Sequence, residues 1–201
     1  GYDHLDRCDP TRDLVVAEVD GLPVAYSRVW WDQEPDGPLI YRHVCFVDSE
    51  HSGRGIGGAL FAWNESRLRE IAADHDASDR LYEVWASDGN LGATKLTRDA
   101  GYDAITYAAE MVRPTVDDLP DHQLPEGLEI RPVTDDQLRE IWEADVEAFR
   151  DHWGFVEQTE ADYERFLAFP YHDPTLWKIA WDEEGVAGHI TVRDPEYPDC
   201  F

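Results

Sequence analysis

The sequence predicts an α+β protein in which short strands and amphipathic helices alternate along the chain. In the first half, runs of β-branched and aromatic residues surround a stretch whose apolar residues recur at helical spacing. In the second half, a short strand is followed by helical periodicity and then by a strand–turn–strand pattern. This last pattern resembles the first hairpin of the chain, which suggests a repeated domain.

The first half provides a sheet and its helices. Residues 14–20 and 24–32 flank the turn sequence Gly-Leu-Pro, which is typical of a hairpin. The nearly continuous apolar run at 39–48 is typical of a strand buried on both faces. Gly101 suits the position that ends a helix. The expected elements are strands at 14–20, 24–32, 39–48, 81–87 and 102–112, with helices at 56–74 and 90–101.

The second half begins after a segment rich in proline and acidic residues, 113–127, which has little periodicity and is typical of a linker. Thr134 and Gln137 have the spacing of a capping box, which marks a helix start. Pro170 is expected to stop a second helix. The expected elements are a strand at 128–133, a helix from Leu138 to Phe149, a helix at 159–169 and a hairpin at 176–194.

The chain is strongly acidic, with 44 Asp and Glu against 17 Lys and Arg and a formal net charge of −27. Such a surface repels phosphates, so neither nucleic acid nor an anionic membrane is expected as a partner. The acidity is explained either as an ordinary solvated surface or as adaptation to a salt-rich cytoplasm, where screening relieves the repulsion.

The cysteines and the start of the chain favour a cytoplasmic protein. Cys8, Cys45 and Cys200 are odd in number and widely spaced, which argues against a disulfide framework or a zinc ribbon. No apolar run approaches the length of a membrane span, and no signal segment is evident. His152 has no second ligand three or four residues away, so no metal is expected.

Residues 50–60, EHSGRGIGGAL, place glycines and one arginine between an expected strand and an expected helix. Backbone amides at a helix N-terminus are a general site for anions. A Walker loop would need Lys followed by Ser or Thr, where this chain has Gly58 and Ala59. The glycine spacing also matches a dinucleotide fingerprint, but the next strand carries only Glu83, in its middle.

A third design fits better, because Ser52-Gly53-Arg54-Gly55-Ile56-Gly57-Gly58 resembles motif A of the GNAT acyl-coenzyme A transferases. Downstream, Asn90, Ala93 and Leu96, followed by Gly101-Tyr102, resemble the second coenzyme A element of that family. The resemblance covers residues 14–112. It implies an α/β/α sandwich with a mixed, mostly antiparallel sheet, and acetyl-CoA as co-substrate. The residues that would bind it are Cys45, Phe46, Val47, Gly53, Arg54, Gly55, Ile56, Gly57, Gly58 and Asn90.

The two halves resemble the junction of tandem GNAT proteins of the mycothiol synthase type. Residues 1–113 would be the later part of a first domain with the coenzyme A motif, 114–126 a linker, and 127–201 the opening part of a second domain. The first half lacks an opening strand and two helices, and the second half stops before a motif A. We therefore expect a fragment truncated at both ends, with a single permuted domain as the alternative.

The resemblance implies transfer of an acetyl group to an amine of a small-molecule acceptor. Such chemistry needs a base for the ammonium and an acid for the thiolate. His43, with an ordinary pKa on a strand position expected to face the cleft, is the candidate base; the alternative, a packed or surface-facing histidine on a strand, has the larger weight. Tyr102 is the candidate acid. The family's tyrosine falls on Thr97, and Ser52 replaces the first Arg or Gln of the loop. The alternative is therefore a non-catalytic coenzyme A-binding or interaction module.

Overall fold

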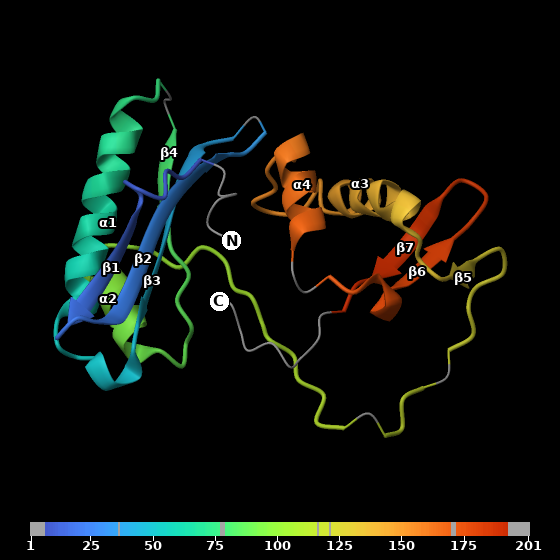
Figure 1. Cartoon of the computed structure of the whole chain (residues 1–201), viewed down its shortest axis with the longest axis horizontal. Helices are drawn as coiled ribbons and strands as arrows, with labels where there is room; N and C mark the ends of the chain where they lie inside the picture. Colours follow the sequence, from blue (N-terminus) through green and yellow to red (C-terminus); the bar gives the residue numbers. More distant parts are fainter. Residues whose placement is uncertain are drawn as a thin grey trace. The chain divides into compact units, whose positions relative to one another are not determined.

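A computed structural model describes residues 7–35, 37–76, 79–115, 117–120, 122–169 and 172–192 of the 201-residue chain. The chain separates into two compact units, residues 1–108 and residues 109–201 (Figure 1). Cys200, Pro170 and the last two residues of the expected hairpin, 193 and 194, lie outside the described residues.

The first unit contains a four-stranded sheet with the strand order β1-β2-β3-β4. Its strands are β1 (Leu14–Val19), β2 (Leu22–Gln33), β3 (Leu39–Val47) and β4 (Arg80–Glu83). The first three are antiparallel neighbours, whereas β4 runs parallel to β3. A parallel neighbour needs a crossover connection, and α1 (Ile56–Ala73) provides it. The sheet is therefore mixed and mostly antiparallel, as expected.

Helix α1 covers one face of this sheet (Figure 1). Its buried residues include Leu60, Phe61 and Leu68. Leu68 and Ala72 form a core cluster with alternate residues of the strands, Val29, Leu39 and Tyr41. Because successive strand residues point to opposite faces, the odd-numbered residues of β2 and β3 face α1. This parity decides which side chains of β3 lie in the core.

Helix α2 (Leu91–Asp99) ends as the sequence predicted. Gly101 has φ +88°, and the amide of Tyr102 donates to the carbonyl of Thr97 at 3.1 Å. This bond and the one from Gly101 N to Arg98 O, at 3.0 Å, together form a Schellman motif. The motif fixes the direction of the chain as it leaves α2 and places Tyr102 beneath α1.

The second unit has its own sheet, with the order β5-β6-β7 and antiparallel pairing throughout. Trp177, Ile179 and Trp181 pack with Ile141 of α3 in a separate core. Thr134 and Gln137 form the predicted capping box, and Thr159 forms a similar one with Asp162. The elements are β5 (Glu129–Arg131), α3 (Leu138–Ala148), α4 (Glu160–Ala168), β6 (Lys178–Trp181) and β7 (Val186–Ile190).

Two expectations about strands are wrong. The strand expected at 81–87 ends at Glu83, and residues 102–112 form no strand. Neither sheet of the described chain pairs with 102–112, so its backbone lacks the partner that a strand requires. Beyond Tyr102 its apolar side chains remain exposed, with Tyr107 at 81% and Met111 at 92%. Local composition favoured a strand here, but no neighbouring strand completes it.

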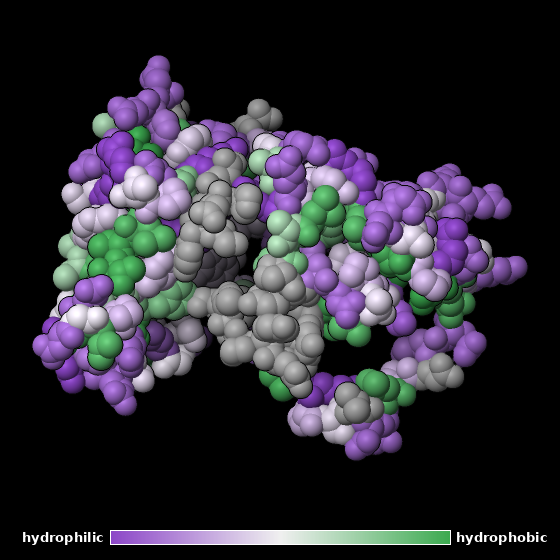
Figure 2. Space-filling view, viewed as in Figure 1, coloured by the Kyte–Doolittle hydropathy of each residue, from purple (hydrophilic) through white to green (hydrophobic). Residues whose placement is uncertain are grey.

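The visible surface is mostly hydrophilic, with smaller hydrophobic areas (Figure 2), in keeping with the net charge of −27. Within the described ranges, no helix is both long enough and apolar enough to cross a membrane.

Candidate coenzyme site

The glycine-rich loop connects the end of β3 to the start of α1. Asp48 accepts a hydrogen bond from the amide of Glu50 at 2.9 Å and begins a short 3₁₀ turn over Ser49–His51. The chain then reverses through Gly53, with φ +74°, and Gly55, with φ +86°. L-residues rarely adopt this left-handed conformation, so glycine is needed at both positions.

The loop leaves the N-terminus of α1 without a cap. Gly55 occupies the N-cap position and supplies no side chain, and the first turn of α1 contains no acidic residue. The first helical amides, those of Ile56, Gly57 and Gly58, have no acceptor within the helix, and none is found for them in the described part of the chain. These donors lie at the positive end of the helix dipole and are therefore available to an anion.

The space beside these amides is open. A Cβ atom built on Gly53, Gly55 or Gly58 would meet no heavy atom within 4 Å. On Gly57 it would contact only Val47 Cγ2, at 3.7 Å. Arg54 is exposed and has no ion pair among the described residues. The loop thus combines free amides, a free guanidinium and room for a ligand.

The end of β3 adds an exposed backbone edge to this site. Strand β4 pairs with β3 only from Leu39 to Arg42, so from His43 to Val47 no described strand covers that edge. Phe46 is 44% exposed, and Cys45 is a half-buried free thiol. Burial raises the pKa of Cys45, with an opposing contribution from its hydrogen bond with Ser27, so the structure gives this thiol no activating partner.

His43 does not have the environment expected from the sequence. Its side chain is 1% exposed and points toward α1, where Asn64 Nδ2 lies 3.0 Å from Nδ1. Asn64 Oδ1 in turn accepts from Ser27 Oγ at 2.7 Å. Burial lowers the pKa of His43 to about 4, with a small opposing contribution from Glu65. The expectations of an ordinary pKa and of a cleft-facing side chain are therefore wrong, because α1 covers this face of β3.

Tyr102 lies beside His43, so the structure brings the two candidate catalytic residues together. Their ring centroids are 6.3 Å apart, and both rings pack edge-on against Phe61 of α1. Burial raises the pKa of Tyr102, and the nearby Glu65 carboxylate raises it further. Asn90 caps α2, its Oδ1 accepting from the amide of Ala93 at 3.0 Å. Its side-chain oxygen therefore has a structural role.

The opposite face of the sheet carries a charged group that the sequence analysis missed. Arg42 Nε donates to Glu83 Oε1 at 2.7 Å, and Arg42 also pairs with Asp32. Asp32 accepts further bonds from Trp30 Nε1 at 3.1 Å and from Arg7 at 3.3 Å. The sequence does show polar residues at even-numbered positions of β2 and β3. It does not show whether the even-numbered or the odd-numbered residues face α1.

This group marks the point where the two parallel strands separate. Arg42 and Glu83 are register partners, and β4 ends at Glu83 while β3 continues to Val47. Asp32 has donors on both carboxylate oxygens, whereas for Glu83 Oε2 no donor is found among the described residues. In the same residues no cluster of His, Cys, Asp and Glu is arranged to hold a metal ion.

Comparison with known proteins agrees with this geometry. The sequence profile described as acetyltransferase (GNAT) family matches residues 2–102. A mycothiol acetyltransferase of Geodermatophilus obscurus is 29% identical over 188 residues, which are 92% of this chain and 57% of that protein. A mycothiol acetyltransferase of Streptomyces coelicolor is 30% identical over 161 residues, 79% of this chain and 47% of that protein.

Among solved structures, a GCN5-related N-acetyltransferase from Sphaerobacter thermophilus superimposes with a TM-score of 0.58 at 21% identity. The match covers 94% of this chain and 59% of that one, and it supports the fold alone. The chain spans about half the length of the curated relatives it matches. Because the family profile covers half of the chain, including the strand, glycine loop and helix described above, the chain belongs to the acetyltransferase (GNAT) family.

Proposed function

We propose that this chain is part of an N-acetyltransferase that moves an acetyl group from acetyl-CoA to an amine of a small-molecule acceptor. The observation that carries the proposal is the uncapped N-terminus of α1, with three free amides beside open space. A pyrophosphate fits such donors. The names of the relatives point to a mycothiol-related amine as the acceptor.

Residues on both sides of the loop would hold the coenzyme. The amides of Ile56, Gly57 and Gly58, with the Arg54 guanidinium, suit the pyrophosphate, and the uncovered edge of β3 at 45–47 suits an extended chain of amide groups. Acetyl-CoA supplies the acyl group as a thioester. Asn90 would contribute only through its side-chain NH₂, because its Oδ1 caps α2.

The acceptor amine must lose a proton before its nitrogen can form an amide bond. Glu83 is our candidate for the base, because it stands where β3 and β4 separate and its Oε2 has no donor in the described chain. Asp32 is less suitable, since Arg7, Trp30 and Arg42 occupy both of its oxygens. His43 and Tyr102 stay predictions, and the burial of both favours a packing role.

The first test is calorimetry of acetyl-CoA binding. Gly55→Glu should abolish binding, because a carboxylate would enter the space beside the amides. Gly21→Glu is the matched control: Gly21 has φ +79° and open space around it, but it lies in the β1–β2 turn. Binding that survives Gly55→Glu, or that Gly21→Glu also abolishes, would contradict the assignment of the loop.

The second test separates transfer from binding. Release of the coenzyme thiol is followed over a panel of small-molecule amines that includes mycothiol-related ones. Glu83→Gln should lower kcat by about 10²-fold or more, whereas Asp32→Asn should lower it far less. Binding without turnover of any amine would favour the non-catalytic coenzyme A-binding module instead.

A further inference from the structure

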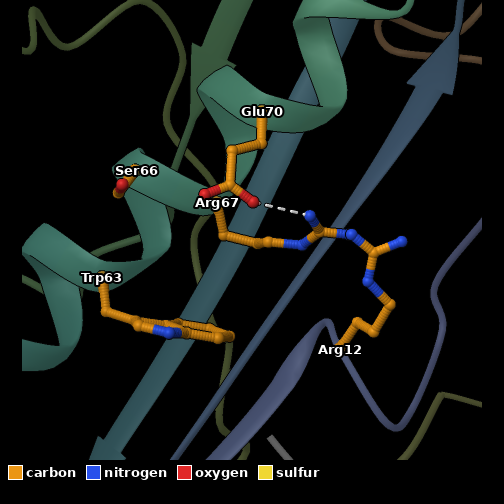
Figure 3. Close-up of a pocket in the computed structure, with 5 residues that line it drawn as sticks. All are labelled: Arg12, Trp63, Ser66, Arg67 and Glu70. Carbon is orange, nitrogen blue, oxygen red and sulfur yellow. Dashed lines mark hydrogen bonds and ion pairs between the residues drawn. The ribbon is translucent and has the colours of Figure 1, made fainter.

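A pocket lies beside α1, next to the segment that leads into β1 (Figure 3). Its volume is about 300 Å³ and its walls come from two places in the chain. Arg12 lies just before β1, and the other lining residues all belong to α1. The lining is Arg12, Trp63, Ser66, Arg67 and Glu70.

This pocket is separate from the coenzyme site. At about 1.5 Å per residue, Trp63 lies about 10 Å and Glu70 about 21 Å along the helix from Ile56. Arg12 belongs to the β1 edge of the sheet, while the glycine loop follows β3, two strands away. Nothing in the acetyltransfer proposal uses these residues.

The two arginines of the pocket have different partners. Arg67 is held in place by Nε, which donates to the buried Asp13 at 2.8 Å, and by Nη1, which donates to Glu70 at 2.8 Å. No ion pair or side-chain hydrogen bond is found for the Arg12 guanidinium within the described residues. Figure 3 shows the Arg12 side chain extending to the Arg67 guanidinium, with the flat Trp63 indole below them.

Two guanidinium groups side by side repel each other unless an anion bridges them. Asp9, whose pKa is lowered mainly by hydrogen bonds, lies close enough for the charges of Arg12 and Arg67 to contribute to that lowering, but no carboxylate accepts a hydrogen bond from Arg12 in the described residues. Asp13 and Glu70 more than offset the charge of Arg67, so the Arg12 guanidinium is the positive group of the lining that no carboxylate is bonded to among the described residues. A ligand with one negative charge suits this single group, whereas the second charge of a dianion would meet Glu70 and Asp13.

We propose that this pocket binds a small organic carboxylate with a flat apolar body. The Arg12 guanidinium and the outward side of Arg67 would hold the carboxylate, because guanidinium donors match its planar geometry. The Trp63 indole would support the apolar body. Arg67 is preorganised by its bonds to Asp13 and Glu70, so binding would require only Arg12 to become ordered.

The proposal is tested with benzoate as the probe, on the whole 201-residue chain. Binding is followed by the indole N–H signal of Trp63 in ¹H–¹⁵N spectra, which Trp63→Phe identifies by its disappearance. We expect a saturable shift with a Kd in the millimolar range. Benzamide, which has the same ring without the charge, should give none. Phenyl phosphate, as a dianion, should bind more weakly than benzoate.

Arg12→Gln should weaken benzoate binding about tenfold, the effect of losing one charge-assisted partner. The matched control is Arg69→Gln, which removes an exposed arginine of the same helix outside the pocket and should leave the Kd unchanged. Gly55→Glu should also leave it unchanged, which keeps this test independent of the coenzyme proposal. The proposal would be overturned if benzoate caused no shift of the Trp63 signal, if Arg12→Gln left the affinity unchanged, or if benzamide bound equally well. Tighter binding of phenyl phosphate, or loss of benzoate binding in Gly55→Glu, would also overturn it.

Discussion

Acidification should destabilise the first unit through one buried side chain, His43. The ring is 1% exposed and its Nδ1 is paired with Asn64, while its buried Nε2 has no hydrogen-bond partner among the described residues. Burial penalises the protonated form more than the charge of Glu65 favours it, and the pKa falls from 6.5 to about 4. The folded state therefore resists protonation of this histidine, and the unfolded state does not.

The direction and size of the effect follow from that difference. As the pH falls below 6.5, the unfolded chain binds a proton that the folded chain does not bind until about pH 4. Stability is therefore fully present above pH 6.5 and is lost as the pH falls toward 4. At about 1.4 kcal/mol per pKa unit, the whole loss is about 3 kcal/mol.

The assay must isolate His43 from the other titrating groups, because protonation of many carboxylates also relieves repulsion in so acidic a chain. We would measure urea unfolding of wild type and His43→Gln between about pH 7.5 and about pH 4.5, through NMR signals of β3 and α1. The difference in unfolding free energy between the two proteins should shrink by about 2.5 kcal/mol over this range.

Val29→Ala serves as the control for general destabilisation. Val29 is a fully buried core residue of the same sheet, and its truncation should cost about 2 kcal/mol without any dependence on pH relative to wild type. A constant difference between wild type and His43→Gln, or direct titration of the His43 ring near pH 6.5, would refute the reasoning.

Three further outcomes are expected. Gly55→Ala should lower the unfolding free energy by about 1–2 kcal/mol, because the φ of +86° at this position strains an L-residue. Gly58→Ala, inside the helix, should raise it by up to about 1 kcal/mol. Urea titrations check both, and effects of the same sign would contradict the assigned backbone. Asn64→Ala should cost about 2–3 kcal/mol in the same assay, since it deprives buried Ser27 and His43 of a partner, and a loss below about 0.5 kcal/mol would argue against the buried network. Finally, multimolar KCl should raise the unfolding temperature by screening the net charge of −27, and equal unfolding temperatures in low and high salt would exclude high-salt adaptation.

Local signals predicted the elements of the first unit well. The expected helix at 56–74 is observed as Ile56–Ala73, and the strand expected at 39–48 is Leu39–Val47. The end of α2 at Gly101 and the capping box at Thr134 depend on residues close in sequence, and the structure confirms both. Periodicity and capping are local properties, so one sequence is enough to read them.

The features that were predicted wrongly depend on contacts between residues that are distant in sequence. The strand expected at 102–112 had suitable composition, but a strand also needs a partner, and neither described sheet provides one. The prediction of which β3 side chains face the cleft was wrong for a related reason. Its run Leu-Ile-Tyr-Arg-His-Val puts two apolar or aromatic residues and one polar residue on each face, so the sequence does not say which face α1 covers. The wrong parity placed His43 in the cleft, whereas the residue lies in the core, and it concealed the charged group around Arg42.

The acidity of the chain and the anionic ligand proposed for it are compatible because electrostatic effects are local at ordinary ionic strength. The Debye length is about 10 Å at 0.1 M salt, so carboxylates on distant surfaces contribute little at the loop. Close to it, the first turn of α1 contains no acidic residue, and one oxygen of Asp48 already accepts a backbone amide. The donors left at contact distance are three amides and Arg54, aided by a helix dipole equivalent to about half a positive charge. An anion bound at these donors therefore contacts positive partial charges, while the nearby carboxylates belong to Asp48 and Glu50 of the turn before the loop.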